Sequence, residues 1–368
     1  MNSPAGELDS ERLMSLDVFR GFTMFLLIAE GTGVFSALSD ETFRGSVVGF
    51  IGAQLHHHEW HGLTFWDLVQ PFFMFIVGAA LPFAVRARIA KGDSRRAITL
   101  HVLKRSLVLL LLGWGLYCIG PGRITFRFQN VLAQLSVTYL IAFLLMNRKW
   151  WIQLGASFAL LLATEIIYRT FWVAGYNQPF TPDHNFGAWV DQMITGELSG
   201  GHWVSFNAIP TAAHTIWGVL AGQLLMSNQR WQRKVVILVG CGIAAVFAGY
   251  GLDLVTPIIK RIATTSFVVI TGGWCLVSLA LCYWLVDVVK VRSWPAFFTI
   301  VGMNSLFIYL FTELDGDDIL RSIAKPFVEA AFSWTADLYL QMITGAIVWA
   351  MLWGVCYWLY RRRVFIKI

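Results

Sequence analysis

The sequence predicts an all-α, polytopic integral membrane protein with about ten transmembrane helices. Of its 368 residues, 57% are hydrophobic and only 14% are charged, whereas a soluble domain has about 25% charged and roughly 45–50% apolar residues. Apolar runs near the length needed to cross about 30 Å of hydrocarbon recur along the whole chain. We therefore expect residues 1–368 to form a single transmembrane domain, in which residues 1–17 are a short cytoplasmic N-terminal segment.

Ten apolar runs are the candidate spans. Most are long enough to cross the bilayer at about 1.5 Å of rise per residue. The third and fourth are short, so they are expected to be tilted or paired across the GPG turn at Gly120–Gly122. The expected spans are 18–38, 64–86, 104–120, 130–147, 150–171, 207–226, 234–252, 265–287, 295–313 and 336–360.

The basic residues predict the orientation, because cytoplasmic loops are enriched in Lys and Arg. With the N-terminus inside, most of the 28 Lys and Arg residues fall in inside segments. Both termini are therefore predicted to be cytoplasmic. The net charge of +6 comes from basic residues that lie mainly in the inside segments. We therefore attribute this charge to membrane orientation and expect no nucleic-acid partner. Residues 172–206 and the acidic loop 313–327 are expected on the outer side.

The stretch LHHHEWHGLTFWDLV at 55–69 collects four of the eight histidines and lies on the predicted outer side, just before the second span. Its H-E-x-H spacing is one residue shorter than the zinc motif H-E-x-x-H, so we expect no metal. A solvated interfacial patch is one reading. The other is a catalytic imidazole, since imidazoles titrate near neutral pH and exchange protons with reacting groups.

Two carboxylates lie close to this cluster in the predicted topology. Glu30 and Asp67 occupy the outer halves of adjacent spans and have no cation near them in sequence. Charged residues inside spans are costly, about 2.5–3.5 kcal/mol at a helix centre, and commonly line a polar cavity. Contact between helices is the alternative. A carboxylate beside a catalytic histidine would fix its tautomer, and Glu30, Glu59 and Asp67 are available for this.

Other polar residues inside the spans have structural explanations. Asp17 and Arg20 are three residues apart, and Glu165 and Arg169 are four apart, so each pair shares a helix face. His214 is isolated in its span and reads as a core histidine or a functional one.

Two quoted stretches carry a resemblance to a known family. RLMSLDVFRGFTMF at 12–25 and HHHEWHGLTFWDLVQPFFMFIVGAALPFA at 56–84 resemble the heparan-α-glucosaminide N-acetyltransferase family and its bacterial relatives. That family shows S-L-D-x-x-R-G, followed by H-x-x-W-x-G-x-T-x-x-D-L. Further similar stretches occur in order along nearly the whole chain, and the H-x-x-W-x-G-x-T block is the most specific of them.

The resemblance implies a multi-helix enzyme that takes an acetyl group from cytoplasmic acetyl-CoA and passes it to a glucosamine amine on the far side. Its active histidine precedes the tryptophan by three residues, which is His57 here, with Asp67 or Glu30 to orient the ring. Asn304, or a backbone amide, would stabilise the developing oxyanion. The nucleotide phosphates would be neutralised near the cytoplasmic side by basic residues, for which the candidates are Arg20, Arg86, Arg88 and Arg105.

One departure concerns the fourth span. The family often shows R-x-x-G-V-L-Q-R there, whereas this chain has Asn130 in place of the glycine and Gln134 in place of the final arginine. A cation that would serve the acyl donor or a carboxylate is therefore missing.

We expect an acyltransferase of a bacterial inner membrane, with acetyl-CoA as co-substrate, an amino sugar or related glycan as acceptor, and a possible homo-oligomeric state. A transporter or flippase for a sugar or lipid-linked glycan is the alternative. In that case Glu30, Asp67 and Glu165 would line a substrate or proton path. A third class is a non-catalytic membrane assembly partner.

Overall fold

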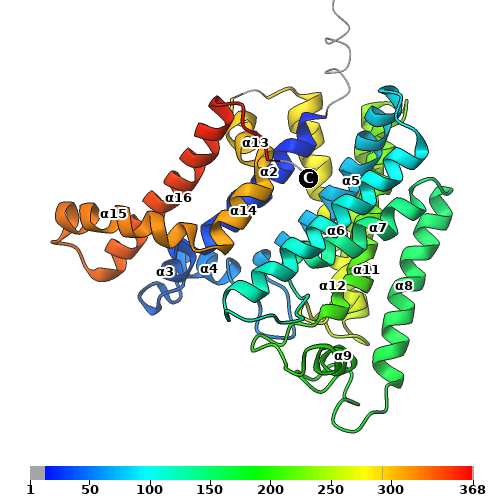
Figure 1. Ribbon diagram of the computed structural model, residues 1–368, viewed down its shortest axis with the longest axis horizontal. Coiled ribbons are helices and arrows are strands. Elements are labelled where there is room, and N and C mark those ends of the chain that lie inside the picture. Colours follow the sequence, from blue (N-terminus) through cyan, green and yellow to red (C-terminus); the bar gives the residue numbers. More distant parts are fainter. Residues whose placement is uncertain (1–12, 292, 367–368) are drawn as a thin grey trace, which may run out of the picture. The chain divides into compact units, whose positions relative to one another are not determined.

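The computed structural model describes residues 13–291 and 293–366, and their regular secondary structure is helical, with loops between the helices (Figure 1). The expected all-α class is confirmed for them. Their only strand-like pairing is a single bridge between His61 and Ile259. The α-helices are α2 (Met14–Glu30), α3 (Val34–Leu38), α4 (Val47–Gln54), α5 (Val69–Ala90), α6 (Arg95–Ile119), α7 (Val131–Met146), α8 (Trp150–Thr170), α9 (Phe186–Thr195), α10 (Ala208–Met226), α11 (Trp231–Leu252), α12 (Thr265–Tyr283), α13 (Pro295–Met303), α14 (Ser305–Glu313), α15 (Gly316–Phe332) and α16 (Asp337–Arg361).

Six helices in the described residues are long and apolar enough to cross a membrane, and the bent pair α13–α14 would make a seventh. The six are Phe65–Ala90, Arg95–Ile119, Trp150–Thr170, Trp231–Leu252, Thr265–Val288 and Asp337–Arg361. The integral membrane class therefore stands, but the expected count of about ten is not confirmed. The other expected runs are helical too, over stretches that are shorter, such as the 16 residues of α7, or less apolar.

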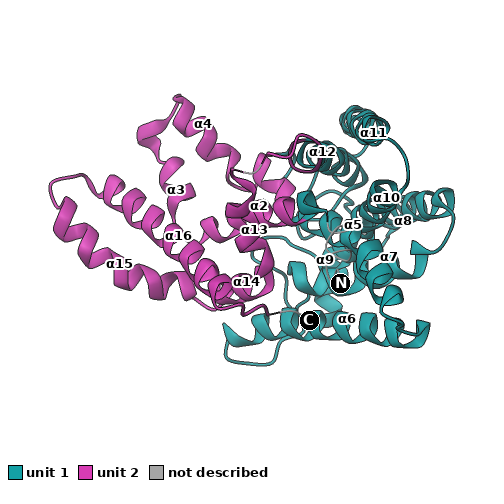
Figure 2. Cartoon of the chain, turned by 90° about the horizontal axis from the view of Figure 1, so that it is seen from above, with its two compact units in different colours: residues 1–16, 59–63, 70–284 teal, residues 17–58, 64–69, 285–368 magenta. Residues whose placement is uncertain are grey.

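The chain divides into two compact units, and each is discontinuous in sequence (Figure 2). Unit 1 contains residues 1–16, 59–63 and 70–284, and unit 2 contains residues 17–58, 64–69 and 285–368. The histidine-rich stretch is therefore shared between them. The expectation of a single acyltransferase domain stays a prediction.

Helix α10 is the core of unit 1, where it packs against α7, α8 and α12. Glycines allow α5 and α10 to approach closely. A Cβ at Gly218 would lie 2.1 Å from the carbonyl oxygen of Phe75, and one at Gly78 would lie 2.0 Å from that of Thr215. Small residues at such crossings are typical of membrane helices, which associate by close backbone packing.

The segments of unit 1 that the sequence predicts on the outer side contact one another. Glu197, in the loop after α9, accepts hydrogen bonds from Arg123 and Arg127, each at 2.6 Å. Arg261 donates to the carbonyl oxygen of Gly201 at 2.7 Å. These contacts agree with helices that cross alternately, so that every second connection lies on the same side. Which side faces the cytoplasm stays a prediction.

In unit 2, α16 packs against α3, α13 and α15, and α2 crosses α13 at two glycines. A Cβ at Gly21 would lie 1.9 Å from the carbonyl oxygen of Phe298, and one at Gly302 would lie 2.8 Å from that of Asp17. Trp349 of α16 stacks on Phe25 of α2 with ring centroids 4.4 Å apart. These contacts hold α2 between α13 and α16.

Three expected elements differ from the structure. The run expected as one span at 18–38 breaks after Glu30, and α3 resumes beyond Gly33, whose positive φ of 76° suits glycine. The run 295–313 bends by 68° between α13 and α14. The segment expected as an acidic loop at 313–327 lies mostly in α15, because its apolar residues recur at helical spacing, which the acidic composition concealed.

Candidate active site

His57 and Asp67 lie together in unit 2. Nδ1 of His57 is 2.9 Å from Oδ1 of Asp67. The Asp67 side chain is 1% exposed, whereas 32% of the His57 side chain is exposed. The pair therefore consists of a buried carboxylate and an imidazole that a substrate can reach. His57 follows α4, and Asp67 lies in the short helix η3 (Phe65–Leu68) that leads into α5.

The second oxygen of the Asp67 carboxylate is held by backbone and hydroxyl donors. Oδ2 accepts from the backbone N–H and the hydroxyl of Thr64, both at 3.0 Å, and from the backbone N–H of His58 at 3.3 Å. Thr64 and Asp67 form a capping box at the start of η3, a reciprocal arrangement that satisfies the open N–H groups of a helix end. The carboxylate is thus fixed in one orientation, with Oδ1 directed at His57.

This arrangement sets the chemistry available to His57. A carboxylate oxygen only accepts, so Nδ1 of His57 carries the proton that it donates to Asp67. In the neutral ring the lone pair then lies on Nε2. An imidazole oriented in this way takes a proton from an attacking nucleophile and returns it to a leaving group.

The remaining histidines of the stretch have separate structural contacts. Nδ1 of His56 lies 3.0 Å from the carbonyl oxygen of Gly52 and 3.0 Å from the hydroxyl of Ser39, so His56 caps the end of α4. Its own carbonyl oxygen accepts from the hydroxyl of Thr64 at 2.6 Å. His58 is exposed and contributes its backbone N–H. The count of histidines alone did not separate these roles.

His61 belongs to unit 1 together with Trp60. Nε2 of His61 lies 2.8 Å from Oδ1 of Asp253, and the indole N–H of Trp60 donates to the carbonyl oxygen of Phe180 at 2.8 Å. Gly62 donates its N–H to the carbonyl oxygen of Ile258 at 2.9 Å. The segment 59–63 is thereby bound to the loops of unit 1 around Phe180 and 253–258. These partners lie 120 and 192 residues away in sequence, so no local pattern predicts the contacts.

The other candidate carboxylate, Glu30, contacts a different residue. It accepts from the indole N–H of Trp66 at 3.3 Å. Trp66 is buried against Phe35 and lies next to Asp67 in sequence. The structure therefore brings Asp67, and not Glu30, to the His57 ring, and it places Glu30 on the neighbouring tryptophan.

Asn304 lies at the bend between α13 and α14 and is fully buried. Its amide binds the C-terminal segment: Nδ2 donates to the carbonyl oxygen of Val364 at 3.1 Å, and Oδ1 accepts from the N–H of Ile366 at 3.1 Å. These partners lie beyond the end of α16. Asn304 therefore lies near the end of α16. The first half of that helix has different neighbours, since Gly345 lies close to the backbone of Thr32, next to α3. The structure thus shows the Asn304 amide engaged in backbone contacts, and its role in catalysis stays a prediction.

The four candidate donor-site arginines have mixed surroundings. In unit 2, Arg20 forms the expected ion pair with Asp17 at 3.6 Å. In unit 1, Arg88 pairs with Asp93 at 2.9 Å, and Arg86 is exposed. Binding of phosphates by these residues stays a prediction.

Arg105 is the candidate with a distinctive environment. Its guanidinium lies 4.8 Å from the centre of the Tyr139 ring. Its Nε is buried and has no hydrogen-bond partner within the described residues. A buried donor of this kind is costly unless something binds it.

The departure at the fourth span has a structural explanation. The side chain of Asn130 caps α7 by accepting from the N–H of Ala133 at 2.9 Å. Gln134 accepts from the amide of Gln70 and donates to the carbonyl oxygen of Gln129 at 2.9 Å. A neutral amide, Gln134, therefore stands where an arginine was expected, and it is bound by the amide of Gln70.

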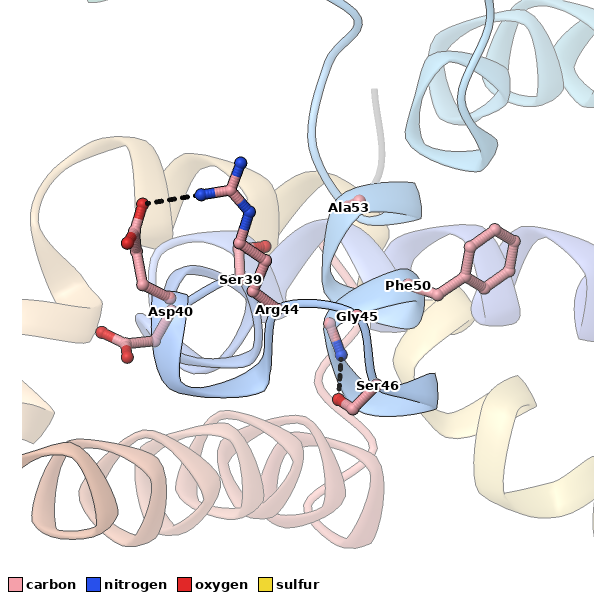
Figure 3. Close-up of a pocket in the computed structure, with 9 residues that line it drawn as sticks. Ser39, Asp40, Arg44, Gly45, Ser46, Phe50 and Ala53 are labelled. Atoms are coloured by element: carbon pink, nitrogen blue, oxygen red, sulfur yellow. Dashed lines mark hydrogen bonds and ion pairs between the residues drawn. The ribbon is translucent and has the colours of Figure 1, made fainter.

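A hollow of about 570 Å³ lies within unit 2, along the segment that precedes the histidine-rich stretch (Figure 3). Ser39, on its wall, hydrogen-bonds His56, which precedes His57. The size is that of a small-molecule site, which typically measures about 300–1,000 Å³. Its lining combines charged and hydroxyl side chains with apolar surface, and consists of Ser39, Asp40, Glu41, Arg44, Gly45, Ser46, Gly49, Phe50 and Ala53.

Within the described residues, no group of three or more His, Cys, Asp or Glu side chains is arranged to hold a metal ion. The expectation that no metal is needed stays a prediction. In chemical terms, the described site offers an exposed imidazole that a buried carboxylate orients.

The fold and the His57–Asp67 pair define a helical membrane protein with a histidine suited to proton transfer. Comparison with known proteins adds a likeness. Residues 12–123 match the family described as a domain of unknown function, DUF5009. The chain is 23% identical to the human heparan-alpha-glucosaminide N-acetyltransferase over 97% of its own length, and 22% identical to the mouse enzyme over 98%. The resemblance found in the sequence is therefore confirmed as a distant one. The chain spans about three fifths of the length of these two relatives, 60% and 61%.

Proposed function

We propose that the protein is a membrane-bound acyltransferase that moves an acetyl group from cytoplasmic acetyl-CoA to an amino sugar or related glycan acceptor on the outer face of a bacterial inner membrane. The observation that carries the proposal is the contact between His57 and Asp67. The distant likeness to two N-acetyltransferases supports the type of reaction.

In the proposed mechanism, His57 acts as the general base. The amine nitrogen of the acceptor attacks the thioester carbonyl carbon, and Nε2 of His57 takes the proton that this nitrogen loses. The carbon–sulfur bond then breaks, and the proton passes from His57 to the departing thiolate of CoA. Asp67 keeps the ring in one tautomer and stabilises the imidazolium that forms.

A covalent route uses the same residues. In that route Nε2 of His57 attacks the thioester first and carries the acetyl group, and the acceptor amine removes it in a second step. Incubation with acetyl-CoA in the absence of acceptor, followed by mass spectrometry of the protein, distinguishes the two routes. Release of CoA together with a protein heavier by one acetyl group indicates the covalent route.

For the acyl donor, we propose the cytoplasmic ends of the helices as the docking region. Arg20, Arg86, Arg88 and Arg105 are the candidates to neutralise its phosphates. The buried, unpartnered Nε of Arg105 is the feature that favours it among the four.

The transporter alternative predicts a path of available carboxylates, including Glu165. In the structure Glu165 accepts from Arg169 at 2.6 Å and from Thr256 at 2.6 Å. These contacts favour a structural role for Glu165, as its spacing from Arg169 predicts.

Proteoliposomes containing the purified protein test the proposal. Acetyl-CoA is supplied together with a panel of amino sugars and cell-envelope fragments, and the products are analysed by mass spectrometry. We expect acceptor-dependent release of free CoA and a product heavier by one acetyl group. Uptake of a sugar with no consumption of acetyl-CoA would support a transporter instead.

A further inference from the structure

Helix α15 presents three different faces along its 17 residues. One face is buried within unit 2, where α15 packs against α14 and α16. Ala324 and Val328, which are four residues apart, are 5% and 2% exposed and belong to this face. The helix is therefore anchored to its own unit and does not depend on another partner for its position.

A second face of α15 is charged and largely exposed, although Arg321 on it is half buried and also donates to the carbonyl oxygen of Gly31 at 2.7 Å. Asp318 pairs with Arg321 at 3.4 Å, and Lys325 pairs with Glu329 at 3.7 Å. Pairs at i,i+3 and i,i+4 spacing on an exposed helix face are typical of a surface in water. Ser322 is also exposed on this side of the helix.

The third face of α15 is apolar and exposed. Ile319, Ile323 and Phe327 are 56%, 50% and 73% exposed, and their spacing of four residues places them on one stripe. Trp334, just beyond the end of the helix, is 79% exposed. A strongly amphipathic helix with a charged face and an aromatic residue at its end is the pattern of a helix that lies in a membrane interface.

The neighbouring helix indicates what covers this stripe. α15 packs against α16, which is long and apolar enough to span a membrane and begins at Asp337, five residues after α15 ends. The exposed apolar residues of α16, such as Ile347, would face lipid along that span. The apolar stripe of α15 therefore lies beside a helix whose length and apolar composition suit contact with the bilayer.

We propose that α15 lies along the membrane surface at the end where α16 enters it. Ile319, Ile323 and Phe327 are inserted among the lipid acyl chains, and the charged face is in water. The exposed apolar stripe is thus covered by lipid of that leaflet. The proposal does not depend on the chemistry assigned to His57.

Site-directed spin labelling of the full chain in phosphatidylethanolamine–phosphatidylglycerol vesicles tests this proposal. Single cysteines are introduced at Ile319, Ile323 and Phe327, and at the matched positions Ser322 and Glu329 on the charged face. The background has Ala in place of Cys118, Cys241 and Cys282, and it retains the two cysteines that are buried, Cys275 and Cys356.

Collisions of each label with oxygen and with a water-soluble nickel chelate are measured. We expect oxygen, which concentrates in the acyl chains, to dominate at the three apolar positions, and nickel to dominate at Ser322 and Glu329. Nickel dominating at Ile323 and Phe327 would show that the stripe faces water and overturn the proposal. Exclusion of both reagents there would show a protein cover, such as a second copy of the chain, and would also overturn it.

If the cysteine replacements prevent folding, the test passes to the native cysteine background. Ile323→Asp and the matched Ser322→Asp are then compared by hydrogen exchange of α15 in the same vesicles. We expect faster exchange across α15 in Ile323→Asp only, because the new charge expels the helix from the acyl chains. Equal exchange in both variants would overturn the proposal.

Discussion

Thr64 and His57 bind different oxygens of the Asp67 carboxylate. The N–H and hydroxyl of Thr64 each lie 3.0 Å from Oδ2, while Nδ1 of His57 lies 2.9 Å from Oδ1. The capping of a short helix and the orientation of a candidate catalytic imidazole therefore share one carboxylate. This relationship connects local backbone structure with proposed chemistry, and it leads to the first two predictions.

Replacement of Asp67 with Asn should lower kcat by about 10²- to 10⁴-fold, the range attributed to a properly placed general base. The Asn amide has only one acceptor oxygen, so it cannot accept from both His57 and the donors that bind Oδ2, and it carries no charge to stabilise the imidazolium. Initial rates of CoA release at saturating acceptor measure this effect.

Asp183→Asn is the matched control for that variant. Asp183 also pairs with a histidine, His202, at 2.7 Å, and it has a positive φ that Asn tolerates. We expect its activity to remain within about twofold of wild type, since it lies outside the proposed chemistry. An equal loss of activity in both variants would contradict the assignment of Asp67.

Replacement of Thr64 with Val should lower kcat modestly while the protein stays folded. A net hydrogen bond contributes about 0.5–1.5 kcal/mol, which corresponds to roughly 2- to 12-fold in rate. Thr64→Ser keeps the hydroxyl, so its kcat should stay close to that of wild type. If Val and Ser behave alike, the hydroxyl does not position the carboxylate.

Replacement of Gly21 with Ala should destabilise unit 2. The added Cβ would lie 1.9 Å from the carbonyl oxygen of Phe298, and overpacking of this kind costs about 1–3 kcal/mol. Gly354→Ala is the matched control, because nothing lies within 4 Å of a Cβ at that position. Thermal unfolding in detergent should show a melting temperature several degrees lower for Gly21→Ala and no decrease for Gly354→Ala. No difference between the two would contradict the close crossing of α2 and α13.

Glu197 should make the loop after α9 and its contacts in unit 1 sensitive to pH. The hydrogen bond from Arg123 holds the pKa of the Glu197 carboxyl below its ordinary value. Its contribution is therefore present above the unfolded value, near 4.5, and is lost as pH falls through the lower value of the folded protein.

Hydrogen exchange of residues 186–205 tests this prediction. At neutral pH we expect faster exchange in Glu197→Gln than in wild type. The difference should shrink as pH falls below the unfolded value, and it should also shrink in high salt, because the groups are exposed. A difference that is unchanged by acid would contradict the role of this ion pair.

Part of this arrangement could be predicted from sequence. Apolar runs mark the helices, because hydrocarbon requires about 20 apolar residues per span. They do not mark breaks such as the one at Gly33 or the 68° bend beside Asn304, which depend on packing against other helices. The helical stripe of α15 was concealed by its acidic residues.

The candidate site could likewise be predicted only in part from sequence. The choice of His57 came from its spacing to Trp60, and the position of Asp67 ten residues later made it a possible partner. Sequence alone left Glu30 and Asp67 as equal candidates to orient the ring. Only the fold shows that Trp66 binds Glu30, while Asp67 faces His57. The contact of His61 with Asp253 spans 192 residues, and no local pattern predicts it.

The most direct test of the account is transfer of labelled acetyl from acetyl-CoA by His57→Ala, compared with His58→Ala. His58 is the neighbouring exposed histidine, and its contact with Asp67 is made by its backbone N–H, which alanine retains. The account predicts that His57→Ala remains folded and loses transfer by at least about 10²-fold, whereas His58→Ala stays within about twofold of wild type. Near wild-type transfer by folded His57→Ala would contradict the central claim.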